Sequence, residues 1–257
     1  SKAVKNADII SILIPDQVMA SFVSNSILPF LKENQTLLFS HGYNIFYNKI
    51  IPPKNVNVIM VAPSGAGIMV REAFKKNSGV PNLIAIEQDY SGNSLELALS
   101  YSKAIGGTRA GAFLSTFKEE TESDLFGEQV VLCGGIPALI QTAFDVLVEQ
   151  GFQPIVAWYV CFYEVKLIVD VFHENGFQQM FNAISTTAEF GGLKQGKRII
   201  NESVKKEMKE ILSEIQTKKF LSELEEDALN NFQKLNSMKK LQLESIFEQT
   251  TKKLKRD

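Results

Sequence analysis

Residues 9–16 read IISILIPD, and this stretch decides the fold. Nearly every position up to Ile14 is apolar, which suits a strand buried on both faces of a parallel sheet. Pro15 and Asp16 then close the run with turn-forming residues. Similar apolar runs follow at residues 36–40, 56–62, 83–86 and 112–117, separated by segments long enough for crossover helices. The first half therefore predicts an α/β fold with a doubly wound parallel sheet over residues 1–117.

The second half has a different pattern. Between Ile136 and Val148 the apolar residues repeat at three and four positions, which is the period of an amphipathic helix. Residues 202–257 alternate basic and acidic groups with apolar residues at helical spacing, which is typical of solvated helices with intrahelical ion pairs. Residues 118–257 are thus predicted to form a second, helical domain.

Composition limits the class of protein. The 257 residues carry 27 basic and 29 acidic side chains, so the net charge of −2 gives no general attraction to nucleic acid or to an anionic membrane. The uncharged apolar stretch Ile155–Tyr163 is too short for a membrane helix, which needs about 20 residues. Cys133 and Cys161 are interpreted as core thiols in a reducing compartment, and a cytoplasmic protein is expected.

Two sets of carboxylates are candidate ligands or catalysts. Asp124 and Glu128 are four residues apart, so on a helix they would share one face and could hold a hard cation such as Mg²⁺; a solvated acidic turn is the alternative. Glu164 follows nine uncharged residues and is expected to be buried, which is typical of a functional carboxylate. Its alternative is a structural ion pair with Lys166 or with another basic group.

Two further features lie at predicted strand ends. His41 directly follows the run 36–40, at the sheet edge where open α/β folds bind ligands, although a structural histidine is also common there. Residues 64–67, Ser-Gly-Ala-Gly, could present backbone amides to an anion. A lone GxG is a weak signal, and no full GxGxxG occurs in the sequence, so spacing alone predicts no dinucleotide fingerprint.

Four segments, taken in order, are more specific than these spacings. They are IGGTRAG at 105–111, TFKEETESDLFGEQ at 116–129, EVKLIVD at 164–170 and STTAEFG at 185–191. Together they strongly resemble the ketol-acid reductoisomerase (acetohydroxyacid isomeroreductase) family in its short, bacterial-type form. The similarity runs from about Lys2 to Ile215.

The resemblance implies a Rossmann-type domain that binds NADPH, with NADH as an alternative, and a knotted helical domain that pairs with a second subunit. Two Mg²⁺ ions would hold 2-acetolactate or 2-aceto-2-hydroxybutyrate during alkyl migration, before reduction by hydride. This reaction belongs to valine, leucine and isoleucine biosynthesis. The implied partners are therefore a small acetohydroxy acid and a second copy of the chain, with neither nucleic acid nor membrane.

The family's site residues carry over by position. Asp124 would bridge the two metal ions, Glu128 would bind one of them, and Glu164 and Ser185 would reach the site from the partner subunit. Ser185 would contact the substrate carboxylate. His41 matches the histidine of the family's His-Gly-Phe-Asn segment, here HGYN at 41–44, and would lie near the nicotinamide and the substrate.

Three positions depart from the family pattern. Ser64 replaces a lysine, Ile68 replaces a histidine, and Val160 replaces a glutamate four residues before Glu164. Serine cannot supply the positive charge of lysine, and valine cannot accept hydrogen bonds from metal-bound water. The family's Gly-rich phosphate loop would precede Ser1, so the 257 residues alone are expected not to hold the cofactor in the usual way.

These departures leave alternatives to a full enzyme. One is a catalytically impaired paralogue that keeps the fold and serves as a non-enzymatic dimer or binding subunit. Another is a β-hydroxyacid dehydrogenase of similar two-domain layout, which is disfavoured because such enzymes do not need the metal pair of the DLFGE segment.

Overall fold

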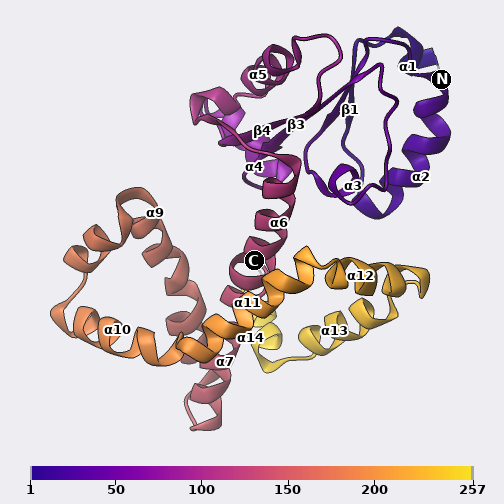
Figure 1. Cartoon of the computed structure of the whole chain (residues 1–257). Helices are drawn as coiled ribbons and strands as arrows, with labels where there is room; N and C mark the ends of the chain where they lie inside the picture. Colours follow the sequence, from indigo (N-terminus) through magenta and orange to yellow (C-terminus); the bar gives the residue numbers. More distant parts are fainter. Residues whose placement is uncertain (1, 256–257) are drawn as a thin grey trace. The chain divides into compact units, whose positions relative to one another are not determined.

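The computed structural model describes residues 2–255, which divide into two units between Asp124 and Leu125 (Figure 1). The predicted domain boundary after Phe117 stays a prediction. The outermost residues of the two predicted domains, 1 and 256–257, lie outside the described part of the chain. Each unit is described by itself.

The first unit is built on a five-stranded sheet whose strands lie in chain order. They are β1 (Ile9–Ile12), β2 (Thr36–Phe39), β3 (Asn57–Pro63), β4 (Asn82–Gln88) and β5 (Ala112–Leu114). β1, β2 and β3 are parallel, as are β4 and β5. All five predicted strands are present, and the α/β class is confirmed.

The prediction of an all-parallel sheet was wrong at one pair, because β4 runs antiparallel to β3. The connection between them contains α4 (Gly67–Lys75), and the amide of Ser64 donates to the carbonyl oxygen of Pro81 at 2.8 Å. The chain therefore returns at the same edge of the sheet that it left. A pattern of buried apolar residues does not encode strand direction, so this reversal could not be read from it.

Helices cover both faces of this sheet. In β2, Leu37 and Phe39 pack into the cluster that includes α2 (Asp16–Ser26) and α3 (Tyr43–Phe46), while Leu38 packs on the opposite side with α5 (Ser94–Ala104). All three side chains are fully buried. Alternation along one strand thus fills two cores, which explains why the strand is apolar at consecutive positions.

The remaining elements of the first unit are short, apart from the helix at its end. They are α1 (Lys2–Asn6), η1 (Leu28–Phe30), η2 (Gly107–Arg109) and α6 (Phe117–Gly127). β5 ends earlier than predicted, because Phe117 is buried as the first residue of α6 instead of extending the strand.

The second unit is helical, as predicted. Its elements are the π-helical segments η3 (Glu128–Leu132) and η4 (Tyr159–Tyr163), and the helices α7 (Gly135–Glu149), α8 (Pro154–Trp158), α9 (Glu164–Ala183), α10 (Thr186–Ile199), α11 (Glu202–Gln216), α12 (Lys219–Leu229), α13 (Gln233–Leu243) and α14 (Ile246–Leu254). Its main core joins Phe144, Ala157, Trp158 and Phe247 from α7, α8 and α14. The indole Nε1 of Trp158 also donates to Thr251 Oγ1 at 2.8 Å.

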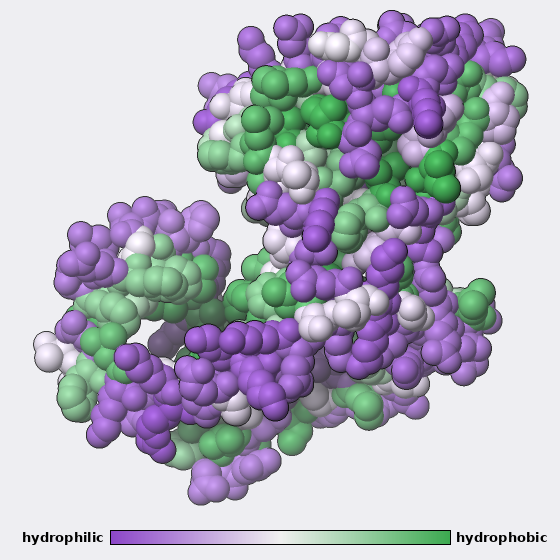
Figure 2. Space-filling model, viewed as in Figure 1, coloured by the Kyte–Doolittle hydropathy of each residue, from purple (hydrophilic) through white to green (hydrophobic). Residues whose placement is uncertain are grey.

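Much apolar surface of the second unit is uncovered in the single chain. Neither α9 nor α10 contains a buried residue, and Figure 2 shows green, apolar surface on this part of the molecule. Cys133 is exposed, so its interpretation as a core thiol was wrong, whereas Cys161 is partly buried and packs against the core around Trp158. Cys133 lies in the turn between η3 and α7.

One helical stretch, Phe117–Glu149, is long and apolar enough to cross a membrane by length and composition alone. It is longer than the apolar stretch 155–163 considered in the sequence. Length and composition do not separate a membrane helix from a helix that packs in a protein interface, so this finding is weak support for a membrane span.

Candidate functional site

His41 lies at the carboxyl end of β2, where the sequence placed it. Ser40 separates it from the strand, and Gly42 is the N-cap residue of the short helix α3. In open α/β sheets, ligands bind at the carboxyl ends of the parallel strands. The His41 side chain is 20% exposed, so it is largely sheltered but still reachable from solvent.

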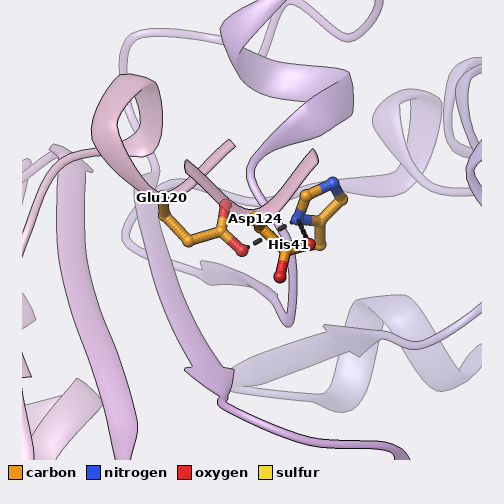
Figure 3. Close-up of side chains that lie close together, drawn as sticks. All are labelled: His41, Glu120 and Asp124. Atoms are coloured by element: carbon orange, nitrogen blue, oxygen red, sulfur yellow. Dashed lines mark hydrogen bonds and ion pairs between the residues drawn. The ribbon is translucent and has the colours of Figure 1, made fainter. Parts of the chain in front are cut away.

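Glu120, on α6, holds His41 and the residue after it. One carboxylate oxygen, Oε1, lies 2.8 Å from His41 Nδ1 (Figure 3). The other, Oε2, accepts a hydrogen bond from the Gly42 amide at 2.8 Å. The Glu120 residue is 3% exposed. Because an ionised carboxylate only accepts hydrogen bonds, the His41 proton is assigned to Nδ1, and this directs Nε2 away from Glu120.

Asp124 is the third member of this cluster. It lies one helical turn after Glu120, and its Oδ2 is 3.5 Å from His41 Nδ1. One ligand atom from each of His41, Glu120 and Asp124 fits within a 4.8 Å span. The Asp124 side chain is 48% exposed, so among these carboxylates it is the accessible oxygen donor, of the hard type that Mg²⁺ prefers.

A further carboxylate lies near this cluster. Asp16, at the start of α2, accepts a hydrogen bond from Asn44 Nδ2 at 3.0 Å through its Oδ1. Burial raises the pKa of Asp16, His41 and Asn44 lower it, and Glu120 raises it. Three acidic groups therefore surround one imidazole.

These charges decide the protonation of His41. Burial of the ring lowers its pKa, but the hydrogen bond to Glu120 and the charges of Glu120, Asp16 and Asp124 outweigh burial and raise the pKa of His41 to about 9. Burial likewise raises the pKa of Asp124, which His41 opposes. At neutral pH, His41 is thus a cation among carboxylates when no metal ion is bound.

Gly42 is required by the close approach of α6. A Cβ atom at this position would lie 2.4 Å from Thr121 Oγ1 and 2.8 Å from the carbonyl oxygen of Phe117. Only glycine allows the loop after β2 to come close enough for its amide to reach Glu120. The residue pair HG at 41–42 is therefore one structural feature.

The sequence predicted His41 and Asp124 but missed Glu120 and Asp16. Glu120 could have been found, because it lies four residues before Asp124 in the acidic run 119–124 and so shares its helix face. Asp16 had a weaker signal, since it was interpreted only as a turn residue after the first strand.

Three other predicted site residues lie in the second unit. Glu128 opens the π-helical segment η3, and Glu164 directly follows η4. Ser185 caps α10, with its Oγ accepting from the Ala188 amide at 3.2 Å. Single π-helical turns inside α-helices are frequent at functional sites, so two of them beside candidate ligands support those candidates.

Glu164 differs from its prediction in burial. It is exposed in the single chain, because no described element covers this face of α9. The suggested ion pair with Lys166 was also wrong, since Lys166 pairs with Asp170. The structure brings His41 and Asp124 together within the first unit and places Glu128, Glu164 and Ser185 in the second.

The departing positions are accessible. Ser64 is exposed between β3 and α4, Ile68 is 72% exposed, and Val160 is 49% exposed within η4. Close to Ser64, a cavity of about 580 Å³ opens at the carboxyl ends of β1, β2 and β3, with Ser40 and Gly65 among its lining residues. Its size fits part of a dinucleotide, and its lining is mostly apolar, with Gly65 and Gly67 leaving room for a close approach to the backbone.

Comparison with family models gives two matches. Residues 1–111 match a model described as "Acetohydroxy acid isomeroreductase, NADPH-binding domain". Residues 117–257 match one described as "Ketol-acid reductoisomerase, C-terminal domain".

Individual proteins agree with these models. The chain is 48% identical over 255 residues to a ketol-acid reductoisomerase (NADP(+)) of Methanocaldococcus jannaschii, covering 99% of this chain and 77% of that protein. It matches the structure of an NADH-preferring ketol-acid reductoisomerase from an uncultured archaeon with a TM-score of 0.97 and 40% identity, over 99% of this chain and 77% of the other. A semialdehyde dehydrogenase NAD-binding protein of Cupriavidus necator, at 15% identity and a TM-score of 0.60, covers 84% of this chain and 80% of its own and shares the fold.

Proposed function

The chain belongs to the ketol-acid reductoisomerase family, and from this premise we propose that it catalyses the Mg²⁺-dependent alkyl migration and NADPH-dependent reduction of 2-acetolactate or 2-aceto-2-hydroxybutyrate. These steps would serve the synthesis of valine, leucine and isoleucine. The observation that carries the proposal within this chain is the cluster of His41, Glu120 and Asp124 at the end of β2.

Carboxylate oxygens in this chain suit a divalent cation. Asp124 offers a half-exposed carboxylate, and we propose that Glu128 and the partner subunit's copy of Glu164 complete the ligand set. Mg²⁺ would act as a Lewis acid that polarises the oxygens of the substrate. Glu120 is a poorer ligand, because both of its oxygens already accept hydrogen bonds.

We propose that His41 acts as a general acid beside that ion. Glu120 fixes the ring through Nδ1, so the Nε2 hydrogen of the imidazolium can be donated to a substrate oxygen that gains negative charge. A cation bound at Asp124 would lower the pKa of His41 from about 9 toward neutrality, where a histidine exchanges protons readily.

The cavity at the ends of β1–β3 is the proposed position of the nicotinamide half of the cofactor. It lies at the sheet edge that also carries His41, and Gly65 and Gly67 leave room for close backbone approach. A cofactor held there would supply the hydride that reduces the rearranged substrate, with NADPH as the proposed donor. NADH is the alternative donor, which one related structure prefers.

A second copy of the chain is the proposed partner. The exposed apolar side chains of α9 and α10 need cover, and Glu164 and Ser185 flank this surface at the starts of the two helices. We propose that both residues enter the site of the other subunit, with Ser185 donating its hydroxyl hydrogen to the substrate carboxylate. The same contact would explain the apolar stretch 117–149 in a cytoplasmic protein that binds neither membrane nor nucleic acid.

An impaired paralogue is the second candidate function. Ser64 and Val160 favour it, because each replaces a charged group of the family's site. The double variant Ser64→Lys/Val160→Glu separates the two functions. If the wild type is impaired, the turnover rate of 2-acetolactate should be higher in the double variant than in either single variant, because both groups act on one bound substrate.

The proposal is tested by following NADPH absorbance with 2-acetolactate and Mg²⁺, using the intact protein. We expect turnover in the wild type and in Glu119→Gln, which alters an exposed neighbour, and its loss in Asp124→Asn. Equal rates in the wild type and Asp124→Asn would contradict the proposed site. No turnover in any variant except Ser64→Lys/Val160→Glu would select the impaired paralogue.

A further inference from the structure

We propose that each site of this protein has one tight position for a divalent cation, at Asp124 and Glu128, and that a second position is weak. This inference rests on the proposed function. It departs from the two-ion site that the family resemblance implies, because the residues of this chain do not fit the second ion equally well.

The segment that should supply ligands for the second ion is apolar. The family has a glutamate where this chain has Val160, and the nine residues 155–163 contain no carboxylate at all. Val160 is 49% exposed, and its neighbours Tyr159 and Tyr163 are 44% and 52% exposed, so this surface presents methyl groups and neutral phenols beside Glu164. Neutral phenols are poor ligands for Mg²⁺, which selects carboxylate, carbonyl and water oxygens.

No nearby carboxylate of the first unit replaces the lost one. Glu120 is 3% exposed, with Oε1 on His41 and Oε2 on the Gly42 amide, so binding a metal would break both hydrogen bonds. Asp16 is engaged by Asn44. Asp124 thus remains the carboxylate of this cluster that a cation can reach without disturbing the fold.

Net charge does not decide between one ion and two. Relative to the family pattern, Ser64 removes one positive charge and Val160 removes one negative charge, so the formal charge of the site is unchanged. What changes is the number of oxygen atoms that bind the second ion or accept hydrogen bonds from its water. Losing such a group weakens metal binding by about 10- to 100-fold.

The experiment counts bound Mn²⁺, used as a paramagnetic substitute for Mg²⁺, by electron paramagnetic resonance of the free ion in solutions of the intact protein. We expect one tight Mn²⁺ per chain in the wild type and two in Val160→Glu. Val160→Gln, which adds similar bulk without charge, should stay at one. Asp124→Asn should lose the tight ion, and Mg²⁺ should displace it from the wild type.

Two tight ions in the wild type, or one in a folded Val160→Glu variant, would overturn this inference and leave the proposed function intact. No Mn²⁺ binding to the wild type would overturn both the inference and the proposed metal dependence. The wild-type count does not depend on how the variants fold, and circular dichroism checks that Val160→Glu is folded.

Discussion

Glu120 joins two parts of the first unit through a single buried carboxylate. Its two oxygens bind the imidazole of His41 and the amide of Gly42, so α6 and the loop after β2 hold each other in place. The hydrogen bond to a charged group at low exposure is stronger than one on the surface. The proposed catalytic arrangement and the stability of this unit therefore depend on the same contacts.

The protonation of His41 predicts a pH dependence of stability. Its folded pKa of about 9 is above the ordinary 6.5, so proton binding stabilises the fold. This stabilisation is fully present below pH 6.5 and is lost as the pH rises through 9. Without metal ions, we expect the free energy of unfolding to fall by about 3 kcal/mol over that range.

Urea unfolding at a series of pH values, in a chelating buffer, measures this effect. The variant His41→Gln should lose the part of the pH dependence that lies between pH 6.5 and 9. An identical profile in the wild type and in His41→Gln would show that the imidazole is not the titrating group.

Gly42→Ala tests the close approach of α6. The added methyl group would meet the Phe117 carbonyl oxygen, which is backbone and cannot rotate away. We expect a loss of about 1–3 kcal/mol in unfolding free energy, the usual cost of overpacking. Gly67→Ala is the matched control, because a methyl group there would meet no atom within 4 Å beyond its own helix backbone, and a larger loss there than at Gly42 would refute the explanation.

At the scale of single residues, the sequence selected two residues that the structure brings together, His41 and Asp124, but it did not predict their surroundings. His41 and Asp124 follow from a strand end and a carboxylate run, which are local patterns. Glu120 gains its role from a loop 78 residues earlier in the chain, through its bond to Gly42. The exposure of Glu164 depends on what covers α9, and an apolar flanking sequence predicts that a surface is covered without saying by which chain.

At the scale of elements, the π-helical segment η3 has a local cause. After η3, a Cβ atom at Gly134 would lie 1.9 Å from the carbonyl oxygen of Gln129, and one at Gly135 would lie 2.0 Å from that of Val130. Two consecutive glycines therefore permit the wide turn. Helical periodicity predicts that a helix is present but does not distinguish its winding, so neither η3 nor η4 was predicted.

Phe247→Ala tests how α14 closes the helical unit. The Phe247 ring meets those of Phe144 and Phe162 at 5.3 Å between centroids and is 8% exposed. Truncation should leave a cavity and reduce the free energy of unfolding by about 3–5 kcal/mol. Thermal or urea unfolding should show almost no change for Leu229→Ala, which is 86% exposed, and equal effects of the two changes would contradict this core.

The order of strands and the change to helices came from apolar periodicity, which records burial. The antiparallel direction of β4 could not be predicted from this periodicity, because a strand buries the same side chains in either direction. Segment-level resemblance then supplied what periodicity could not, namely the family and a proposed set of carboxylate ligands. The correct family assignment depended on the DLFGEQ segment rather than on composition.

For the whole molecule, exposed apolar side chains predict self-association. On α9 and α10, Leu167, Phe177, Phe190 and Leu193 are each more than half exposed. Such a surface is unfavourable in water unless a partner covers it. We expect sedimentation to give twice the 28.7 kDa chain mass at micromolar concentration, and a shift toward monomer in Phe177→Arg/Leu193→Arg.

A wild-type protein that stays monomeric at these concentrations would contradict the proposed dimer. It would also remove Glu164 and Ser185 from the proposed site, since both were assigned to the opposite subunit. The cluster of His41, Glu120 and Asp124 would be unaffected, because it lies within one unit of one chain.

Migration of the alkyl group is the step that distinguishes a reductoisomerase from a simple dehydrogenase, so its direct observation tests the proposed function most closely. The measurement uses 2-acetolactate labelled with ¹³C in the migrating methyl group, together with Mg²⁺ and NADPH, and carbon NMR of the product. We predict a dihydroxy acid with the label on the neighbouring carbon in the wild type and none in Asp124→Asn. Oxidation of NADPH with the label still on its original carbon, or a migrated label in Asp124→Asn, would contradict the assignment of Asp124 to a reductoisomerase site.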